Sequence, residues 1–313
     1  MAFKAVPQKF AAKINALTIG TGEREISLGG ENVFPFYSFD APIENRPKIG
    51  IEIHDRGHYA GVPGMDAYYA GADTLAQTAK RAAAAEGADF LAVSFDGAHP
   101  DNGDRSVEDC VAAIKEVADA VDIPLVIEGS KHIEKDAKLF EKIAEALSGR
   151  NILVMSAREE NYKGIAASVG LAYSQKIGAE SAVDINLAKQ LNVLISQMGV
   201  KSENTAMNLG SAAAGYGFEY VASTVDRVKA AALAQNDTML QMPIVTPVGS
   251  EAWTVKESIV SQEDFPEWGP REIRGINMEV STAAACLAAG SNAVILRHPE
   301  SVKTISKLVS QLS

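Results

Sequence analysis

The sequence has few cysteines, few aromatic residues and no long apolar run. Cys110 and Cys286 are its only cysteines among 313 residues, and two thiolates alone hold neither an iron–sulfur cluster nor a structural zinc ion. No apolar stretch approaches the ~20 residues that span a bilayer. The N-terminal residues also lack the apolar core of a secretory signal, so we expect a cytoplasmic protein.

Positive charge and histidine are scarce as well. The chain carries 29 basic against 40 acidic residues, a net charge of −11 at pH 7, so we expect neither nucleic acid nor a membrane as a partner. Of the five histidines, His54 and His58 are spaced i, i+4, but they lie in a Gly- and Pro-rich loop. Because that spacing indicates metal ligands only on a helix, we expect no metal site.

What the sequence does contain is a regular alternation of short apolar strands and Ala-rich helices from residue 48 onward. Such strands, separated by helices, are typical of a parallel sheet covered on both faces. The expected strands are 48–54, 89–95, 124–128, 152–156, 170–175, 204–208, 242–246 and 292–297. The expected helices are 71–86, 107–120, 134–147, 159–168, 184–198, 217–234, 280–289 and 300–312.

Eight strand–helix units predict an α/β fold, a (β/α)8 TIM barrel. An open doubly wound sheet is the alternative, but no Gly-rich phosphate fingerprint follows the first strand. Residues 1–46 fall outside the alternation, and two short strand-like runs at 16–20 and 25–28 predict a hairpin there. We expect this hairpin to close the bottom of the barrel, with a partner contact as the alternative. The chain then divides into an N-terminal hairpin and lead-in, 1–46, and a barrel, 47–313.

Two loops interrupt the alternation of strands and helices. Residues 247–279 form a long irregular stretch that contains both tryptophans, Trp253 and Trp268, which favours an ordered lid or docking surface over a disordered insertion. The loop 208–217 is rich in glycine and alanine. Small residues before a helix permit close approach by a phosphate or a flat ligand, and tight helix–strand packing explains them equally well.

Polar residues gather at the carboxyl ends of the expected strands. In a barrel these ends share one rim, where such folds carry function, and arginine and histidine donate there to carboxyl, amide or phosphate groups. Solvated loops explain any single one of them, but binding is favoured for the group. The candidate cofactor-binding residues are His54, Arg56, Asp96, Glu128, Gln175, Asn208 and Arg297.

No catalytic set accompanies these rim residues. The sequence has no Gly-x-Ser-x-Gly nucleophile motif. Lys131 and Lys176 lie just past expected strand ends, where a surface lysine is the simpler explanation than Schiff-base chemistry. We therefore expect no catalytic residue on this chain.

Several short motifs occur in order along the whole chain. They are Gly29-Gly30-Glu31-Asn32 with Pro35-Phe36, the strand 48–54, the run 215–220, the run 241–244, Glu251-Ala252-Trp253 with Lys256-Glu257, and Arg297-His298-Pro299. Together they resemble a known family, the small (delta) subunit of the corrinoid iron–sulfur protein of the acetyl-CoA (Wood–Ljungdahl) pathway. One departure is the run 203–208, where members of that pathway tend to carry an aspartate.

The resemblance implies a (β/α)8 barrel that is a non-catalytic subunit of a methyl-transferring complex in carbon fixation. It implies a heterodimer with a large subunit, which carries a [4Fe–4S] cluster and a corrinoid-binding domain. The corrinoid, a B12 (cobalamin-type) cofactor, is then shared between that domain and the barrel rim. Further implied partners are a methyltetrahydrofolate methyltransferase and acetyl-CoA synthase.

A free-standing TIM-barrel methyltransferase that binds a methylated pterin is the alternative. Its pterin site needs aspartate and asparagine at strand ends. Asp96 and Asn208 are available for this, whereas Glu128, Ser156 and Gln175 occupy other expected rim positions. That set is thin, so the corrinoid-holding subunit is favoured.

Overall fold

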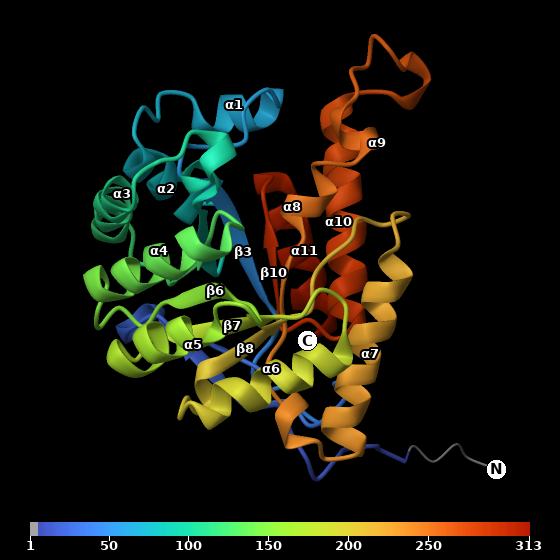
Figure 1. Cartoon of the computed structure of the whole chain (residues 1–313). Coiled ribbons are helices and arrows are strands. Elements are labelled where there is room, and N and C mark those ends of the chain that lie inside the picture. The colour runs from blue at the N-terminus through green and yellow to red at the C-terminus, as the bar shows by residue number, and fades with distance from the viewer. Residues whose placement is uncertain (1–5) are drawn as a thin grey trace, which may run out of the picture.

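Eight parallel strands form the central sheet of the computed structural model, which describes residues 6–313. Consecutive strands are neighbours, β10 pairs with β3, and a bridge between Met207 and Ile244 joins the two ends of the sheet. The predicted TIM barrel is therefore confirmed (Figure 1). The strands are β3 (Lys48–His54), β4 (Phe90–Ser94), β5 (Leu125–Glu128), β6 (Leu153–Ala157), β7 (Lys176–Glu180), β8 (Thr205–Asn208), β9 (Val245–Pro247) and β10 (Ala293–Leu296).

Helices surround this barrel, and most lie where the sequence predicts them (Figure 1). The helix expected at 71–86 is shorter, Leu75–Ala83, because Gly71 adopts a left-handed turn and Thr74 starts the helix by accepting a hydrogen bond from the Gln77 amide. The short helix Pro63–Tyr69 that precedes it was not predicted. Among the described residues, no helix is long and apolar enough to cross a membrane. The helices are α1 (Pro63–Tyr69), α2 (Leu75–Ala83), α3 (Val107–Ala120), α4 (Ile133–Ala146), α5 (Tyr162–Ile165), α6 (Ile185–Gln197), α7 (Phe218–Ala234), α8 (Gly249–Ala252), α9 (Lys256–Ile259), α10 (Arg271–Ala289) and α11 (Pro299–Leu312).

Side chains along each strand alternate between two cores. In β4, Phe90 and Ala92 pack inside the barrel, while Leu91 and Val93 pack against the helices, as the period of two in a strand requires. Gly50 in β3 makes room for the aromatic ring, because a Cβ at this position would lie 2.2 Å from Cε2 of Phe90.

The N-terminal hairpin closes the barrel from below, as expected. Its strands β1 (Leu17–Ile19) and β2 (Ile26–Leu28) pair antiparallel, with Leu17 opposite Leu28. Leu17, Ile19 and Leu28 are buried in the same cluster as the side chains of the barrel interior. Burial of these three apolar side chains holds the hairpin on the barrel.

The prediction of a strand at 170–175 is wrong. Residues Ala166–Ala172 form a π-helix that continues α5, and β7 begins only at Lys176. This apolar run buries one helical face, on which Gly170 packs so closely that a Cβ would lie 2.8 Å from both Ile177 and Val200. As a consequence Gln175 and Lys176 lie at the amino end of β7, opposite the rim.

The segment 247–279 is ordered, but it consists largely of short helices and not of the irregular loop that the sequence predicts. It contains α8, α9, a 3-10 turn at Pro266–Trp268 and the first turns of α10, which begins at Arg271 rather than near 280. Trp253 is fully buried, whereas Trp268 is half-buried and stacks on Phe265 with ring centroids 4.6 Å apart. In Figure 1 the loop between α9 and α10 projects away from the barrel at the top of the view.

Candidate functional site

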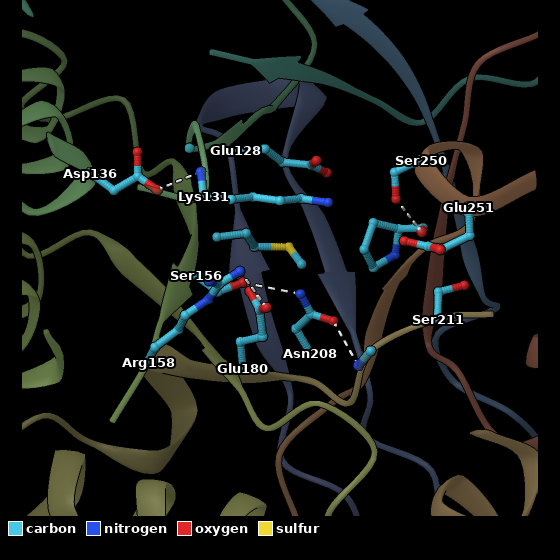
Figure 2. Close-up of a pocket in the computed structure, with 14 residues that line it drawn as sticks. Glu128, Lys131, Asp136, Ser156, Arg158, Glu180, Asn208, Ser211, Ser250 and Glu251 are labelled. Carbon is cyan, nitrogen blue, oxygen red and sulfur yellow. Dashed lines mark hydrogen bonds and ion pairs between the residues drawn. The ribbon is translucent and has the colours of Figure 1, made fainter. Parts of the chain in front are cut away.

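The carboxyl ends of the strands form a rim with two separate hollows. One lies over β3 and β4, and we call it the β3–β4 hollow; its volume is about 430 Å³ and it is lined by His54, Arg56, His58, Tyr59, Ala60 and Asp96. The other is smaller, about 100 Å³, and we call it the β5–β9 cavity (Figure 2). Its polar lining includes Glu128, Lys131, Asp136, Ser156, Arg158, Glu180, Asn208, Ser211, Ser250 and Glu251.

The β3–β4 hollow is organised around Asp96. His54 Nδ1 lies 3.3 Å from Asp96 Oδ1, and Arg56 Nη2 donates to Asp96 Oδ2 at 3.1 Å. Burial alone would raise the pKa of Asp96, but the hydrogen bond and charge of His54, together with the charge of Arg56, lower it well below its usual range. Asp96 is therefore ionised at neutral pH and holds both basic side chains at the rim.

A buried ion pair fills the mouth of the barrel beside this hollow. Arg297 Nε donates to Glu52 Oε2 at 2.8 Å, Arg297 Nη2 donates to Glu52 Oε1 at 3.2 Å, and both side chains are buried. Burial would raise the pKa of Glu52, but Arg297 outweighs it and lowers that pKa. The guanidinium of Arg297 is thus already paired, and its main role is to hold the carboxylate of Glu52.

The same region ties α10 to the rim. Buried Glu279 in α10 accepts hydrogen bonds from the backbone amides of Arg297, at 2.6 Å, and His298, at 3.2 Å. The His298 ring is 2.9 Å from Glu272 Oε1 and stacks on Trp253. The long helix is therefore fixed to the last barrel strand by polar contacts as well as by packing.

The β5–β9 cavity has a floor of side chains that satisfy one another (Figure 2). Arg158 Nη2 and Glu180 Oε1 form an ion pair at 2.7 Å. The amide of Asn208 donates to Ser156 Oγ at 3.1 Å and accepts from the backbone amide of Gly210 at 3.0 Å. These contacts fix the orientation of the floor side chains, each of which keeps further donor or acceptor positions.

Glu128 differs from the floor residues. Its Oε1 atom is buried and has no hydrogen-bond partner within residues 6–313. Burial and the negative charge of Glu52 raise the pKa of Glu128 to about 8, against the opposing effects of Arg297 and Lys131. At neutral pH the side chain is therefore a neutral carboxylic acid, which both donates and accepts a hydrogen bond.

The structure brings together most of the predicted rim residues, in two groups. His54, Arg56 and Asp96 line the β3–β4 hollow, and Glu128 and Asn208 line the β5–β9 cavity. Arg297 belongs to the buried pair between the two groups.

The prediction that Gln175 lies at the rim is wrong. Its side chain accepts from the Ile152 amide at 2.7 Å and donates to the Leu147 carbonyl at 2.9 Å, at the amino end of the barrel. The error arose because the fifth strand was predicted at 170–175, several residues too early. Glu180, the last residue of β7, lies at the rim instead.

Sequence reasoning also missed Glu52 and Ser211. A signal for Glu52 exists, because it is the single charged residue within the apolar run Ile49–Ile53. Ser211 lies in the small-residue loop after β8, and nothing local distinguishes it from its neighbours. In the described part of the chain there is no group of three or more His, Cys, Asp or Glu side chains that could hold a metal ion.

Comparison with known proteins identifies the family whose members this sequence is similar to. The family model for the CO dehydrogenase/acetyl-CoA synthase delta subunit matches residues 16–305. The acetyl-CoA decarbonylase/synthase complex subunit delta of Archaeoglobus fulgidus is 29% identical over 323 residues, covering 99% of this chain and 71% of the relative. Subunit delta 2 of Methanosarcina acetivorans is 29% identical over 297 residues, covering 94% of this chain and 67% of the relative.

Solved structures share the barrel fold at low sequence identity. A dihydropteroate synthase of Xanthomonas albilineans, in complex with indole-2-carboxylic acid and 6-chloroguanine, superimposes with a TM-score of 0.54 at 11% identity. The match covers 95% of this chain and 98% of that one. At this identity the likeness concerns the fold alone.

Proposed function

This chain belongs to the CO dehydrogenase/acetyl-CoA synthase delta subunit family, and we propose that it is the small, non-catalytic subunit of a methyl-carrying complex. A large subunit is its partner and carries the [4Fe–4S] cluster and the corrinoid-binding domain. The corrinoid lies between that domain and the rim of this barrel. The methyl group comes from methyltetrahydrofolate through a methyltransferase and goes on to acetyl-CoA synthase. The names of the relatives, delta subunits of acetyl-CoA decarbonylase/synthase complexes, support a role in such an assembly.

The observation that carries this proposal is a rim with unused hydrogen-bonding capacity. His54 Nε2, Glu128 Oε1 and Ser211 Oγ are buried without a hydrogen-bond partner among residues 6–313. A corrin ring carries carboxamide side chains around its edge, which need both donors and acceptors. Buried polar atoms without partners are costly, so a ligand of this chemistry fits the rim.

In this proposal, the chain binds the corrinoid and orients it. A bound corrinoid supplies a cobalt ion that accepts and releases the methyl group. The Asp96 carboxylate keeps His54 and Arg56 fixed at the edge of the β3–β4 hollow. The Glu52–Arg297 pair gives the barrel mouth a rigid surface, and the two hollows offer contacts on both sides of it.

The free-standing pterin methyltransferase receives less support from the geometry. Its pterin site needed Asp96 and Asn208 to act together, but they line different hollows. In addition, the amide of Asn208 is already engaged with Ser156 and Gly210. One pterin edge therefore does not meet the set of side chains that this alternative requires.

The test is retention of corrinoid by the heterodimer with the large subunit. A rim variant, R56A/K131A/S211A, changes one residue at the β3–β4 hollow and two at the β5–β9 cavity. A matched variant, R24A/D122A/R150A, changes three exposed residues at the opposite end of the barrel.

Corrinoid content per heterodimer is measured from the visible spectrum after gel filtration, with circular dichroism as the folding control. We expect the rim variant to lose corrinoid and the matched variant to keep it. Full retention by the rim variant, or loss confined to the opposite end, contradicts the proposed position of the corrinoid.

A further inference from the structure

The β5–β9 cavity has room for a small functional group. Glu128 and Lys131 reach into it from one wall, and Ser211, Ser250 and Glu251 face them from the opposite wall (Figure 2). Its volume is about 100 Å³. This exceeds the ~10–15 Å³ that one water molecule needs by the same measure, so the cavity has room for a small polar group.

The lining groups differ in whether their polar atoms already have a partner. Arg158 and Glu180 are paired, Asn208 is engaged at both ends, and Ser250 Oγ donates to the Pro247 carbonyl at 3.2 Å. Glu128 Oε1 and Ser211 Oγ, by contrast, are buried and find no partner within the described chain. A ligand that pairs with these two atoms removes the cost of leaving them unsatisfied.

The charges around the cavity exclude an anionic ligand. The basic side chains Lys131 and Arg158 are outnumbered by the acidic side chains in the lining, Asp136, Glu180 and Glu251, even with Glu128 neutral. No surplus positive charge is therefore left for a phosphate or a carboxylate. A neutral polar group is the better match.

The neutral carboxyl of Glu128 specifies what that group is. A carboxylic acid and a carboxamide form two reciprocal hydrogen bonds, from the acid O–H to the amide C=O and from the amide N–H to the acid C=O. We propose that the β5–β9 cavity is a receptor for a carboxamide, with Glu128 as its reciprocal partner and Ser211 as a second contact. A side-chain amide of the corrinoid is one source, which rests on the function proposed above. The lactam edge of a pterin is the other source of the same chemistry.

This receptor depends on pH through Glu128. The charged groups that act on it are Glu52 of β3, Glu180 of β7, Arg297 just after β10 and Lys131 of the loop after β5. As pH rises past about 8, the carboxyl loses the proton that it donates to the amide oxygen. Binding of a carboxamide should therefore weaken by about tenfold between pH 7 and pH 9.

The receptor is tested by ligand-observed NMR titration of the full chain with propionamide, and with propionate as its charged isostere. We expect propionamide to bind about tenfold more tightly than propionate, and E128L to weaken propionamide binding by about tenfold. E128Q presents a donor and an acceptor in the same place, so it should bind at pH 7 without the loss at pH 9. E116L, at an exposed position on α3, is the matched control and should behave as the parent chain.

Equal binding of propionamide and propionate overturns the inference, as does propionamide binding that neither E128L nor pH changes. If E128L fails to fold, the comparison of E128Q with the parent chain at pH 7 and pH 9 still decides the matter, because a pH dependence that persists in E128Q excludes Glu128 as the partner.

Two further titrations, with dicyanocobinamide and with a dihydropterin, separate the sources. Glu128-dependent binding of the corrinoid supports both the receptor and the proposed function. Glu128-dependent binding of the pterin alone supports the receptor and overturns the proposed function. Corrinoid retention by the heterodimer that is indifferent to Glu128, with no propionamide binding, overturns the receptor and leaves the proposed function standing.

Discussion

Individual residues at the barrel mouth combine charge with burial, which makes them sensitive to the loss of a partner. The Glu52–Arg297 pair is the clearest case, because both side chains are buried and are joined by two hydrogen bonds. A buried ion pair adds little net stability over an apolar pair, but removal of one member leaves the other charge uncompensated. Arg297 therefore matters to folding before it matters to any ligand.

Arg297→Met should lower the free energy of unfolding by about 3–5 kcal/mol, because it leaves the buried carboxylate of Glu52 without its partner. Urea denaturation followed by circular dichroism measures this. The double variant E52L/R297M removes both charges and should recover most of the loss. A double variant as unstable as R297M would show that packing, rather than the unpaired charge, causes the loss.

Glu128 should make stability depend on pH. Its folded-state pKa of about 8 lies above the ordinary value of 4.5, so the folded protein binds the proton more tightly than the unfolded chain. The resulting stabilisation is fully present below about pH 4.5 and is lost as pH rises through about 8. Between these values E128Q should gain stability relative to the parent chain by up to about 1.4 kcal/mol per pH unit.

Urea denaturation of the parent chain and E128Q at several pH values between 5 and 9 checks this. E116L, on the exposed face of α3, should follow the parent chain at every pH. A constant difference between E128Q and the parent chain across this range would mean that Glu128 titrates normally.

At the scale of elements, the segment from α8 to α10 shows how one close contact orders a long connection. Gly275 in α10 lies against the ring of Trp253, where a Cβ would come within 2.2 Å of Cζ3. Trp253 in turn stacks on His298 after β10, with ring centroids 5.9 Å apart. The absence of a side chain at residue 275 thus permits the helix, the tryptophan and the barrel to pack together.

Gly275→Ala should destabilise the protein by about 1–3 kcal/mol, because the added methyl group displaces the Trp253 ring in a packed core. Thermal unfolding measures the loss, and tryptophan fluorescence reports the displaced ring. Gly164→Ala in α5 is the matched control, since a Cβ there meets nothing within 4 Å. It should be neutral or stabilising by about 0.5–1 kcal/mol; equal effects of the two substitutions would exclude a steric cause at residue 275.

For the whole molecule, the proposal assigns the iron–sulfur cluster and the corrinoid-binding domain to the large subunit. This chain then has no chromophore that absorbs visible light. Cys110 and Cys286 are both buried and lie in different helices, α3 and α10. We expect the isolated chain to be colourless and to leave methyltetrahydrofolate and free cobalamin unreacted, whereas the heterodimer shows corrinoid and iron–sulfur absorption. Visible spectroscopy and a methyl-transfer assay on both preparations check this. Turnover by the isolated chain would favour the pterin methyltransferase.

Local sequence patterns were enough to predict the barrel and the location of its polar rim. Strand and helix periodicity, helix caps and turn glycines act over a few residues, so they can be read locally. The helices α3 and α6 and the strand β3 accordingly lie within a residue of their predicted bounds. Because parallel strands present their carboxyl ends at one rim, His54, Asp96, Glu128 and Asn208 could be placed there from sequence.

How those residues are divided and paired depends on contacts between distant parts of the chain. Arg297 meets Glu52 across 245 positions of sequence, and no local pattern specifies such a contact. Residues 166–172 form a helix in which Gly170 packs against Val200. Because β7 begins only at Lys176, Gln175 lies at the opposite end of the barrel. Closure of the barrel also separated Asp96 from Asn208 and left Glu128 buried beside Glu52. Burial and charge at a site are sums over neighbours from many strands, which is why the sequence shows where the rim lies and the fold decides what it can bind.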